Sequence, residues 1–268
     1  MRHKFILRTV LTLALMNCSF SASANNPEYS ATEILNAVKF REDGQTRKSK
    51  FHLKLTSKSG FERSREITLL EQDDGADLKS FIYIHKPADV QGTGVMLHAF
   101  DDNSAKQDDI WLYIPAMRKV KRLSAKNKRG RFVSSELSYA DLERLQLQDF
   151  EYHVEGVEDI DGTKTVKILA NVANENAKYK TGYAKKTLWV DTERDILLKE
   201  VYFDEQGMLL KTRRVKTVEK IDSFWTVTHL EVENHQTGDK TDLFLDKVSY
   251  NVPVSKTQFS KVSLKRGL

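Results

Sequence analysis

The sequence predicts a mainly β protein, in which a curled antiparallel sheet forms a barrel or half-barrel with a few covering α-helices. Segments from residue 51 onward alternate apolar and polar side chains, which is the period of a half-buried strand. Compact turn signals separate several of these segments and favour hairpins in chain order. A sheet of about a dozen strands cannot stay open and flat. We therefore expect it to curl around a concave inner face.

The chain begins with a segment typical of a secretory signal peptide. Basic residues at positions 2, 4 and 8 precede an apolar run over residues 10–16, and Ala22-Ser23-Ala24 offers small residues for cleavage. The apolar run is shorter than the roughly 20 residues of a membrane-spanning helix, which disfavours an anchor. We expect an exported protein, periplasmic in a Gram-negative source, with a signal peptide over residues 1–24 and a single domain over residues 25–268.

Cysteine and charge restrict the sites that this domain can carry. The one cysteine, Cys18, lies in the expected signal peptide, so residues 25–268 have no disulfide, thiolate nucleophile or cysteine metal ligand. These residues carry 40 Lys and Arg against 38 Asp and Glu, because three of the 43 basic residues precede residue 25. Balanced charge and export both argue against nucleic-acid binding.

A short helix is expected over residues 30–40. Ser30 can cap it, and Glu33 follows three residues later, as in a capping box. Its apolar side chains recur at helical spacing, on Ile34, Leu35 and Val38. This apolar stripe predicts that the helix covers part of the concave face of the sheet.

A second helix is expected over residues 138–146. Ser138 can cap it, and Asp141 can reach back to the cap. Leu142 and Leu145 would form its buried edge. Apolar residues on the concave face must be covered, and the two expected helices are the available covers.

The expected strands form a meander in their C-terminal part. Three turn signals separate strong alternating runs there: Asp161-Gly162, Glu205-Gln206-Gly207 and Thr237-Gly238-Asp239. The expected strands cover residues 51–55, 62–71, 79–85, 94–100, 110–114, 119–123, 148–155, 163–172, 184–190, 196–203, 209–218, 226–234 and 243–250.

Residues 110–114 carry apolar or aromatic side chains on both faces of one expected strand. Ile110, Leu112 and Ile114 point one way, while Trp111 and Tyr113 point the other. Such a strand is either ordinary core, buried on both sides, or it lines a cavity on one side. The sequence leaves both interpretations open.

A basic run follows this strand. Residues 118–131 contain eight Lys or Arg and no acid. A solvated hairpin explains such a run, but so does a docking surface for acidic partners or anionic lipid headgroups. Each basic residue near an anionic membrane contributes about 1 kcal/mol, so several together matter. The candidate docking residues are Arg118, Lys119, Lys121 and Arg122.

Recognised catalytic motifs do not occur in the sequence. It contains no G-x-S-x-G, no G-x-x-x-x-G-K-[ST] and no G-x-G-x-x-G. The histidines are scattered and lack the H-E-x-x-H spacing, although a zinc site built from distant strands stays open. The sequence therefore predicts a protein that is not an enzyme and needs no cofactor or metal. A secreted hydrolase with a dispersed site is the minority alternative.

Several motifs resemble those of the outer membrane lipoprotein-sorting protein group of the LolA-like superfamily. The central match covers residues 92–97, 109–122, 130–132 and 138–142, and the C-terminal match covers residues 224–228, 234–238 and 251–259. One departure occurs at Ser134-Ser135-Glu136, where members tend to have Gly-Ser-Asp. Losing that glycine changes the backbone freedom of the loop.

The resemblance implies a half-open barrel with helices in its mouth and a hydrophobic cavity for acyl chains. Members resemble companions of RND-type transporters, so the expected partners are an acylated lipoprotein or a lipid, with an RND-type inner-membrane transporter and at most peripheral membrane contact. A periplasmic sensor of the same fold is the alternative. Alternation and aromatic bulk place Met96, Phe100, Trp111, Tyr113 and Trp189 on the cavity wall, and Leu35, Val38, Leu142 and Leu145 on its lid.

Overall fold

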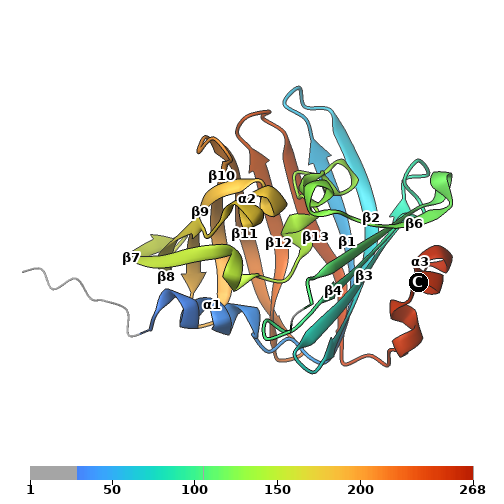
Figure 1. The fold of residues 1–268 in the computed structure, drawn as a ribbon, viewed down its shortest axis with the longest axis horizontal. Coiled ribbons are helices and arrows are strands. Elements are labelled where there is room, and N and C mark those ends of the chain that lie inside the picture. Colours follow the sequence, from blue (N-terminus) through green and yellow to red (C-terminus); the bar gives the residue numbers. More distant parts are fainter. Residues whose placement is uncertain (1–28, 105, 268) are drawn as a thin grey trace, which may run out of the picture.

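The computed structural model describes residues 29–104 and 106–267 (Figure 1). The expected signal peptide, with Cys18, lies outside these residues. Within them, no helix is both long enough and apolar enough to cross a membrane.

One antiparallel sheet of 13 strands makes up most of the described chain, in the order β6-β5-β4-β3-β2-β1-β13-β12-β11-β10-β9-β8-β7. Between residues 29 and 267, leaving out residue 105, the end strands β6 and β7 do not pair with each other, so the curled sheet is half-open. The predicted mainly β fold is confirmed. The strands are β1 (Thr46–Thr56), β2 (Glu62–Asp74), β3 (Asp77–Lys86), β4 (Gly94–Ala99), β5 (Asp109–Ile114), β6 (Lys119–Arg122), β7 (Phe150–Ile160), β8 (Thr163–Val172), β9 (Tyr183–Asp191), β10 (Ile196–Asp204), β11 (Leu209–Ile221), β12 (Phe224–Asn234) and β13 (Lys240–Tyr250).

The chain path forces one segment to cross the open side of the sheet. Strands β1 to β6 run outward to one edge, and strands β7 to β13 return from the opposite edge until β13 pairs with β1. The connection over residues 123–149 must therefore span the whole width between β6 and β7. Figure 1 shows this crossing segment, in green, passing inside the curl.

Strand register assigns every side chain to one of two faces. On the inner face, which carries the crossing segment, Leu53 pairs with Leu243 and Ile82 with Val95. On the outer face Met96 pairs with Trp111. The C-terminal segment covers this part of the outer face with a 3-10 turn (Lys256–Phe259) and α3 (Lys261–Arg266), whose buried members are Phe259 and Leu264.

The helices agree only in part with the expectations. Helix α1 (Ala31–Lys39) is confirmed, with Ser30 and Glu33 forming the capping box. Helix α2 (Glu175–Thr181) was not expected; Asn174 caps its start by accepting from the amide of Ala177, and Gly182 ends it at φ +78°.

The expected helix over residues 138–146 is wrong, because only a 3-10 turn (Ala140–Leu142) forms there. The cap contacts do form: Ser138 donates its amide to Asp141 at 2.7 Å, and the amide of Asp141 donates to the Ser138 hydroxyl at 3.2 Å. The chain then becomes extended at Glu143, with ψ 148°. This extended course lets the Glu143 carboxylate pair with Lys128, a tertiary contact that a continuing helix would lose.

Candidate ligand-binding site

Two different pieces of chain cover the inner face of the sheet. We call residues 131–143 of the crossing segment the plug, and helix α1 the lid. The plug covers the inner face of β1 to β5, and the lid covers that of β7 to β10. The site lies between these covers.

The plug inserts apolar side chains into the core. Phe132 is 1% exposed, and Val133 and Leu137 are buried beside it against Ile82, Val95 and other inner-face residues. Val133 and Ser134 have φ of +42° and +67°, in the left-handed region that disfavours side chains. The structure thus explains why a glycine suits position 134, and it shows that packing holds the plug in a strained conformation.

Glu136 ties the plug to the far strands. Its carboxylate pairs with Arg131 at 2.6 Å and accepts from Asn234 Nδ2 at 2.8 Å. The amide of Glu136 also donates to the hydroxyl of Thr241 at 2.9 Å. The plug therefore has hydrogen-bonded anchors on β12 and β13 as well as apolar contacts.

A second anchor is a buried ion pair between Asp141 and Lys211 of β11. Tyr183 donates its hydroxyl to the same carboxylate at 2.8 Å. Burial by itself raises the pKa of Asp141, but the neighbouring Lys211 ammonium outweighs it, so the pKa lies below its ordinary value. Burial, reinforced by the Asp141 carboxylate, raises the pKa of Tyr183, which stays a neutral donor.

The lid is held mainly by apolar contacts. Leu35 is 0% exposed, and Ile34 and Ala31 are buried beside it against Ile168 and Leu188 of the sheet. A helix of this length is not stable alone in water, so docking on the sheet keeps it folded.

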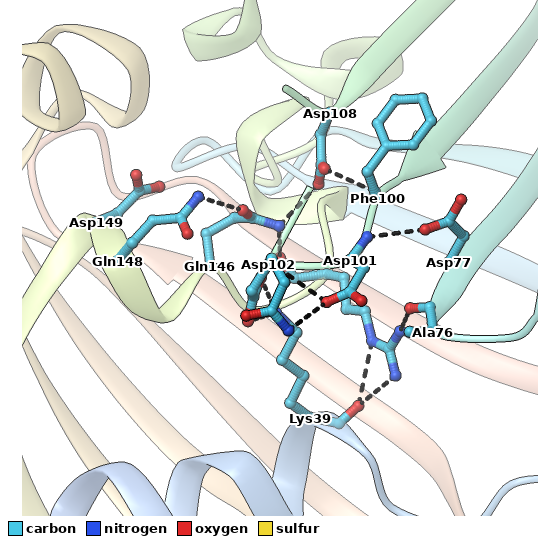
Figure 2. A network of polar contacts seen from close by, with 12 residues as sticks. Lys39, Ala76, Asp77, Phe100, Asp101, Asp102, Asp108, Gln146, Gln148 and Asp149 are labelled. Carbon is cyan, nitrogen blue, oxygen red and sulfur yellow. Dashed lines mark hydrogen bonds and ion pairs between the residues drawn. The ribbon is translucent and has the colours of Figure 1, made fainter. Parts of the chain in front are cut away.

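A polar latch fixes the C-terminal end of the lid, as Figure 2 shows. We define the latch as Lys39, Asp102 and Arg144. The Lys39 ammonium, whose side chain is 2% exposed, pairs with Asp102 at 2.6 Å. Arg144 donates Nη2 to the Lys39 carbonyl and Nη1 to the Ala76 carbonyl, both at 3.0 Å. The latch thus joins the lid to the β2–β3 turn, the β4–β5 loop and the crossing segment.

Neighbouring loops brace this latch (Figure 2). Gln146 donates Nε2 to Asp108 at 2.7 Å, and the same carboxylate accepts from the Phe100 amide at 3.0 Å. Burial raises the pKa of Asp108, opposed by the Phe100 amide and by nearby lysines. The bracing orders the residues that flank Arg144.

A cavity of about 410 Å³ lies between lid, plug and the inner face of β9 to β12. This volume falls in the range of small-molecule sites. Two smaller cavities, of about 270 and 210 Å³, adjoin it, and Arg144 lines all three. Apolar and charged side chains both line the largest one. Its apolar members are Val38, Ala140, Leu145, Phe150, Ile196, Leu197 and Val227.

The structure brings part of the expected lid to this cavity. Val38 and Leu145 line it, and both pack against the apolar cluster that contains the buried Leu35. Leu142, which is part of the plug, packs against the apolar cluster of the inner face and lines the cavity of about 210 Å³.

The residues expected on the cavity wall lie elsewhere. Met96, Trp111 and Tyr113 are on the outer face under the C-terminal segment, where Lys261 Nζ lies 3.5 Å from the centroid of the Trp111 ring. Trp189 is also on the outer face, with Lys199 Nζ 4.3 Å from its ring. Phe100 lines a separate cavity of about 270 Å³ beside α2.

Residues 110–114 are therefore covered on both sides, with Ile110 buried and residues 111–114 half-buried, which is close to the ordinary core that the sequence left open as one possibility. Ile110 faces the plug and Trp111 faces the C-terminal segment. Alternation marked both faces as apolar, but it gave no sign of which cover each face would meet.

The four candidate docking residues lie exposed around β6 and the turn before it: Arg118, Lys119, Lys121 and Arg122. Arg122 pairs with Asp109. Within the described residues the other three have no carboxylate within 4 Å, so their charges are available to a partner.

Sequence reasoning missed the charged side chains of the inner face. Lys186 shares a face with Leu188 and Val190, and Glu200 shares one with Tyr202. The sequence did contain a signal for them: a charged residue at a position that alternation assigns to the apolar face of the strand. They indicate an inner face that is polar where the cavity lies.

A family model described as "Uncharacterized protein" matches residues 76–266, more than half of the chain. No curated protein matches the sequence. Among solved structures, a DUF1329 family protein from Desulfovibrio piger is 26% identical, with a TM-score of 0.80 over 87% of this chain and 96% of that chain. A putative outer membrane lipoprotein-sorting protein domain from Vibrio parahaemolyticus is 28% identical, with a TM-score of 0.78 over 87% and 97%.

A LolA superfamily protein from Nitrosomonas europaea shares the fold at 18% identity, with a TM-score of 0.66 over 88% of this chain and 99% of that chain. These likenesses confirm the resemblance drawn from residues 92–142 and 224–259.

Proposed function

We propose that this chain, which belongs to the DUF1329 family, is a periplasmic carrier that holds the acyl chains of a lipid or lipoprotein between its lid and its sheet. The name of the 28% identical relative, a putative lipoprotein-sorting domain, supports a carrier. The signal-like sequence of residues 1–24 supports export. In this proposal binding and release are the whole activity, and no enzymatic step is needed.

The main support for the proposal is that a short helix, the lid, covers an apolar surface next to the cavity of about 410 Å³. If the lid moves, it uncovers Ile168, Leu188 and Val190 of the inner face. An acyl chain that extends from the cavity would replace the contacts of Ile34 and Leu35 with methylene contacts. The exchange keeps the inner face out of water in both states.

The energies are consistent with a reversible carrier. Each buried methylene contributes about 0.8 kcal/mol, so a 16-carbon acyl chain gains at most roughly 12 kcal/mol. Undocking the lid and the loss of freedom on association both oppose this gain. The net affinity is therefore moderate, as transfer to an acceptor requires.

The exposed basic residues supply a docking surface for this carrier. Arg118, Lys119 and Lys121 lie next to one another at an edge of the sheet and lack acidic partners within the described chain. We propose that they contact an anionic membrane surface or an RND-type transporter during loading or delivery. The contact is peripheral.

The experiment measures the binding of a fluorescent fatty acid by the purified protein and by two variants. Leu35→Ala loosens the lid and should change both the affinity and the rate of uptake. Val201→Ala, on the outer face of β10, is the control and should leave both unchanged. Native mass spectrometry of protein taken from its own periplasm should show a retained lipid. No saturable uptake together with no retained lipid would overturn the carrier.

A further inference from the structure

The charges around the largest cavity do not cancel. Most of its ionic side chains are paired within the described residues. Its acids Asp141, Glu143 and Asp149 pair with lysines that lie outside the cavity wall: Lys211, Lys128 and Lys180. Its remaining ion pairs are Lys39 with Asp102, Arg47 with Asp43 and Glu71, and Arg213 with Glu200.

Three cations of the cavity wall remain without a carboxylate within 4 Å in the described part of the chain: Arg41, Arg144 and Lys186. Arg144 is satisfied only by the backbone carbonyls of Lys39 and Ala76, and its guanidinium stacks 4.5 Å from the centroid of Phe40. Backbone carbonyls satisfy the donors but supply no counter-charge. The acid whose charge interacts with Arg144 is Asp73, which lies outside the wall of the largest cavity.

Arg41 and Lys186 are held in a similar way. Arg41 donates to the carbonyl of Trp225, and burial lowers its pKa despite the nearby acids. The Lys186 ammonium lies 4.8 to 5.3 Å from the ring centroids of Phe150, Tyr183 and Tyr202. Aromatic faces attract a cation without neutralising it.

Asp195 is the one acid of this wall that lacks a cationic partner within 4 Å among residues 29–104 and 106–267. The cavity wall thus holds three unpaired cations against one unpaired acid. A partly buried positive excess is unfavourable until an anion joins it. The adjoining cavity of about 270 Å³ shares Arg41 and Arg144 but is lined by four acids and four bases, whereas the largest cavity is lined by five acids and six bases.

We propose that the carried amphiphile has an anionic headgroup, such as a phosphate, and that Arg144, Arg41 and Lys186 bind it in the largest cavity. This inference rests on the proposed carrier function. Arg144 lines all three cavities, so a headgroup bound to Arg144 lies next to each of them. The acyl chain then extends along Val38, Leu145 and Leu197 toward the surface under the lid. The planar guanidinium of Arg144 suits two-point contact with a phosphate.

The test compares two amphiphiles that share one acyl chain. Palmitoyl lysophosphatidylglycerol has an anionic phosphate, and monopalmitoylglycerol has no charge. Binding of each is measured by calorimetry to the wild type and to Arg144→Gln, Lys186→Gln and Arg144→Lys. Arg214→Gln is the control, because it removes one positive charge from the outer face of β11, on the side of the sheet away from the cavity.

We expect the wild type to prefer the anionic amphiphile, and Arg144→Gln to weaken its binding by about tenfold or more. Lys186→Gln should also weaken the binding of the anionic amphiphile. Because Lys186 is not part of the latch, this variant tests the site even if Arg144→Gln disturbs the latch. Arg144→Lys keeps the charge and should retain part of the preference. Monopalmitoylglycerol should bind all variants alike, and Arg214→Gln should behave as the wild type.

Three outcomes overturn the inference and differ from one another. Equal binding of both amphiphiles, unchanged in every variant, removes the headgroup site but leaves the carrier. If neither amphiphile binds, the proposed carrier function itself is overturned. Displacement of the lysophospholipid by inorganic phosphate at a similar concentration assigns the site to a free anion instead of a headgroup.

Discussion

The plug and the lid cover two halves of the same inner face, but they are held by different forces. The plug combines a fully buried Phe132 with hydrogen-bonded and ionic anchors at Glu136 and Asp141. The lid combines a fully buried Leu35 with a polar latch at one end only. The plug therefore has anchors on the distant strands β11, β12 and β13, whereas the polar anchor of the lid lies at one end, which is why we place the opening of the proposed carrier at the lid.

Phe132→Ala should give the largest effect, because it removes an aromatic ring from the centre of the plug. Truncation of a buried phenylalanine destabilises by about 3–5 kcal/mol. The free energy of unfolding in urea measures it. A loss below 1 kcal/mol would show that the plug is as loosely held as the lid.

Asp141→Asn should destabilise by about 3 kcal/mol, because it leaves the buried Lys211 ammonium without its counter-charge. Urea unfolding at neutral pH measures the loss. The matched control is Asp161→Asn, which breaks the pair with Arg214 at a carboxylate that is 65% exposed. The control should change stability by less than about 1 kcal/mol.

The same anchor predicts an acid dependence. Because the folded pKa of Asp141 lies below its ordinary value of 3.8, its contribution is complete above that value and is lost as the pH falls further. Between about pH 5 and about pH 2, the wild type should therefore lose more stability than Asp141→Asn does. Parallel acid-unfolding curves would contradict the ionic role of this anchor.

Leu35→Ala should act locally, although Leu35 is as buried as Phe132. We expect faster hydrogen exchange over residues 31–39 and stronger binding of a hydrophobic dye, with a smaller loss of global stability than Phe132→Ala causes. If the two variants lower the global stability equally, the lid is part of the folding core and does not open separately.

Asp102→Asn should give the smallest effect, since the pair that it weakens lies at one end of the lid and Asp102 is 30% exposed. Exchange should rise at the C-terminal end of α1, with global stability nearly unchanged. Asp74→Asn, which weakens the pair with Lys79 on the β2–β3 hairpin, is the control and should leave exchange in α1 unaltered.

Alternation and turn signals were enough to predict the strands and a curled sheet, and the family resemblance added that the sheet is half-open. A local cap predicted α1 correctly, because the Ser30 and Glu33 contact lies within the helix itself. The same signal failed at Ser138, since Asp141 and Glu143 bind Lys211 and Lys128 from distant parts of the chain. Such contacts cannot be read from neighbouring residues.

The site was predicted less well for a related reason. Alternation separates Trp111 from Ile110 but does not say which of the two faces is concave. Only the path of residues 123–149 across the sheet makes the Ile110 face the inner one. Lys186 was overlooked although it stands at the apolar phase of its strand, and Arg144 was overlooked because a lone charge in a loop has no periodicity.

Hydrogen–deuterium exchange of the protein, with and without palmitate, tests the carrier with a movable lid most directly. We predict that palmitate changes the exchange of residues 31–39 and of β8 and β9, and leaves residues 131–143 as they were. Unchanged exchange in α1 at saturating palmitate, or a change confined to residues 131–143, would contradict the assignment of lid and plug.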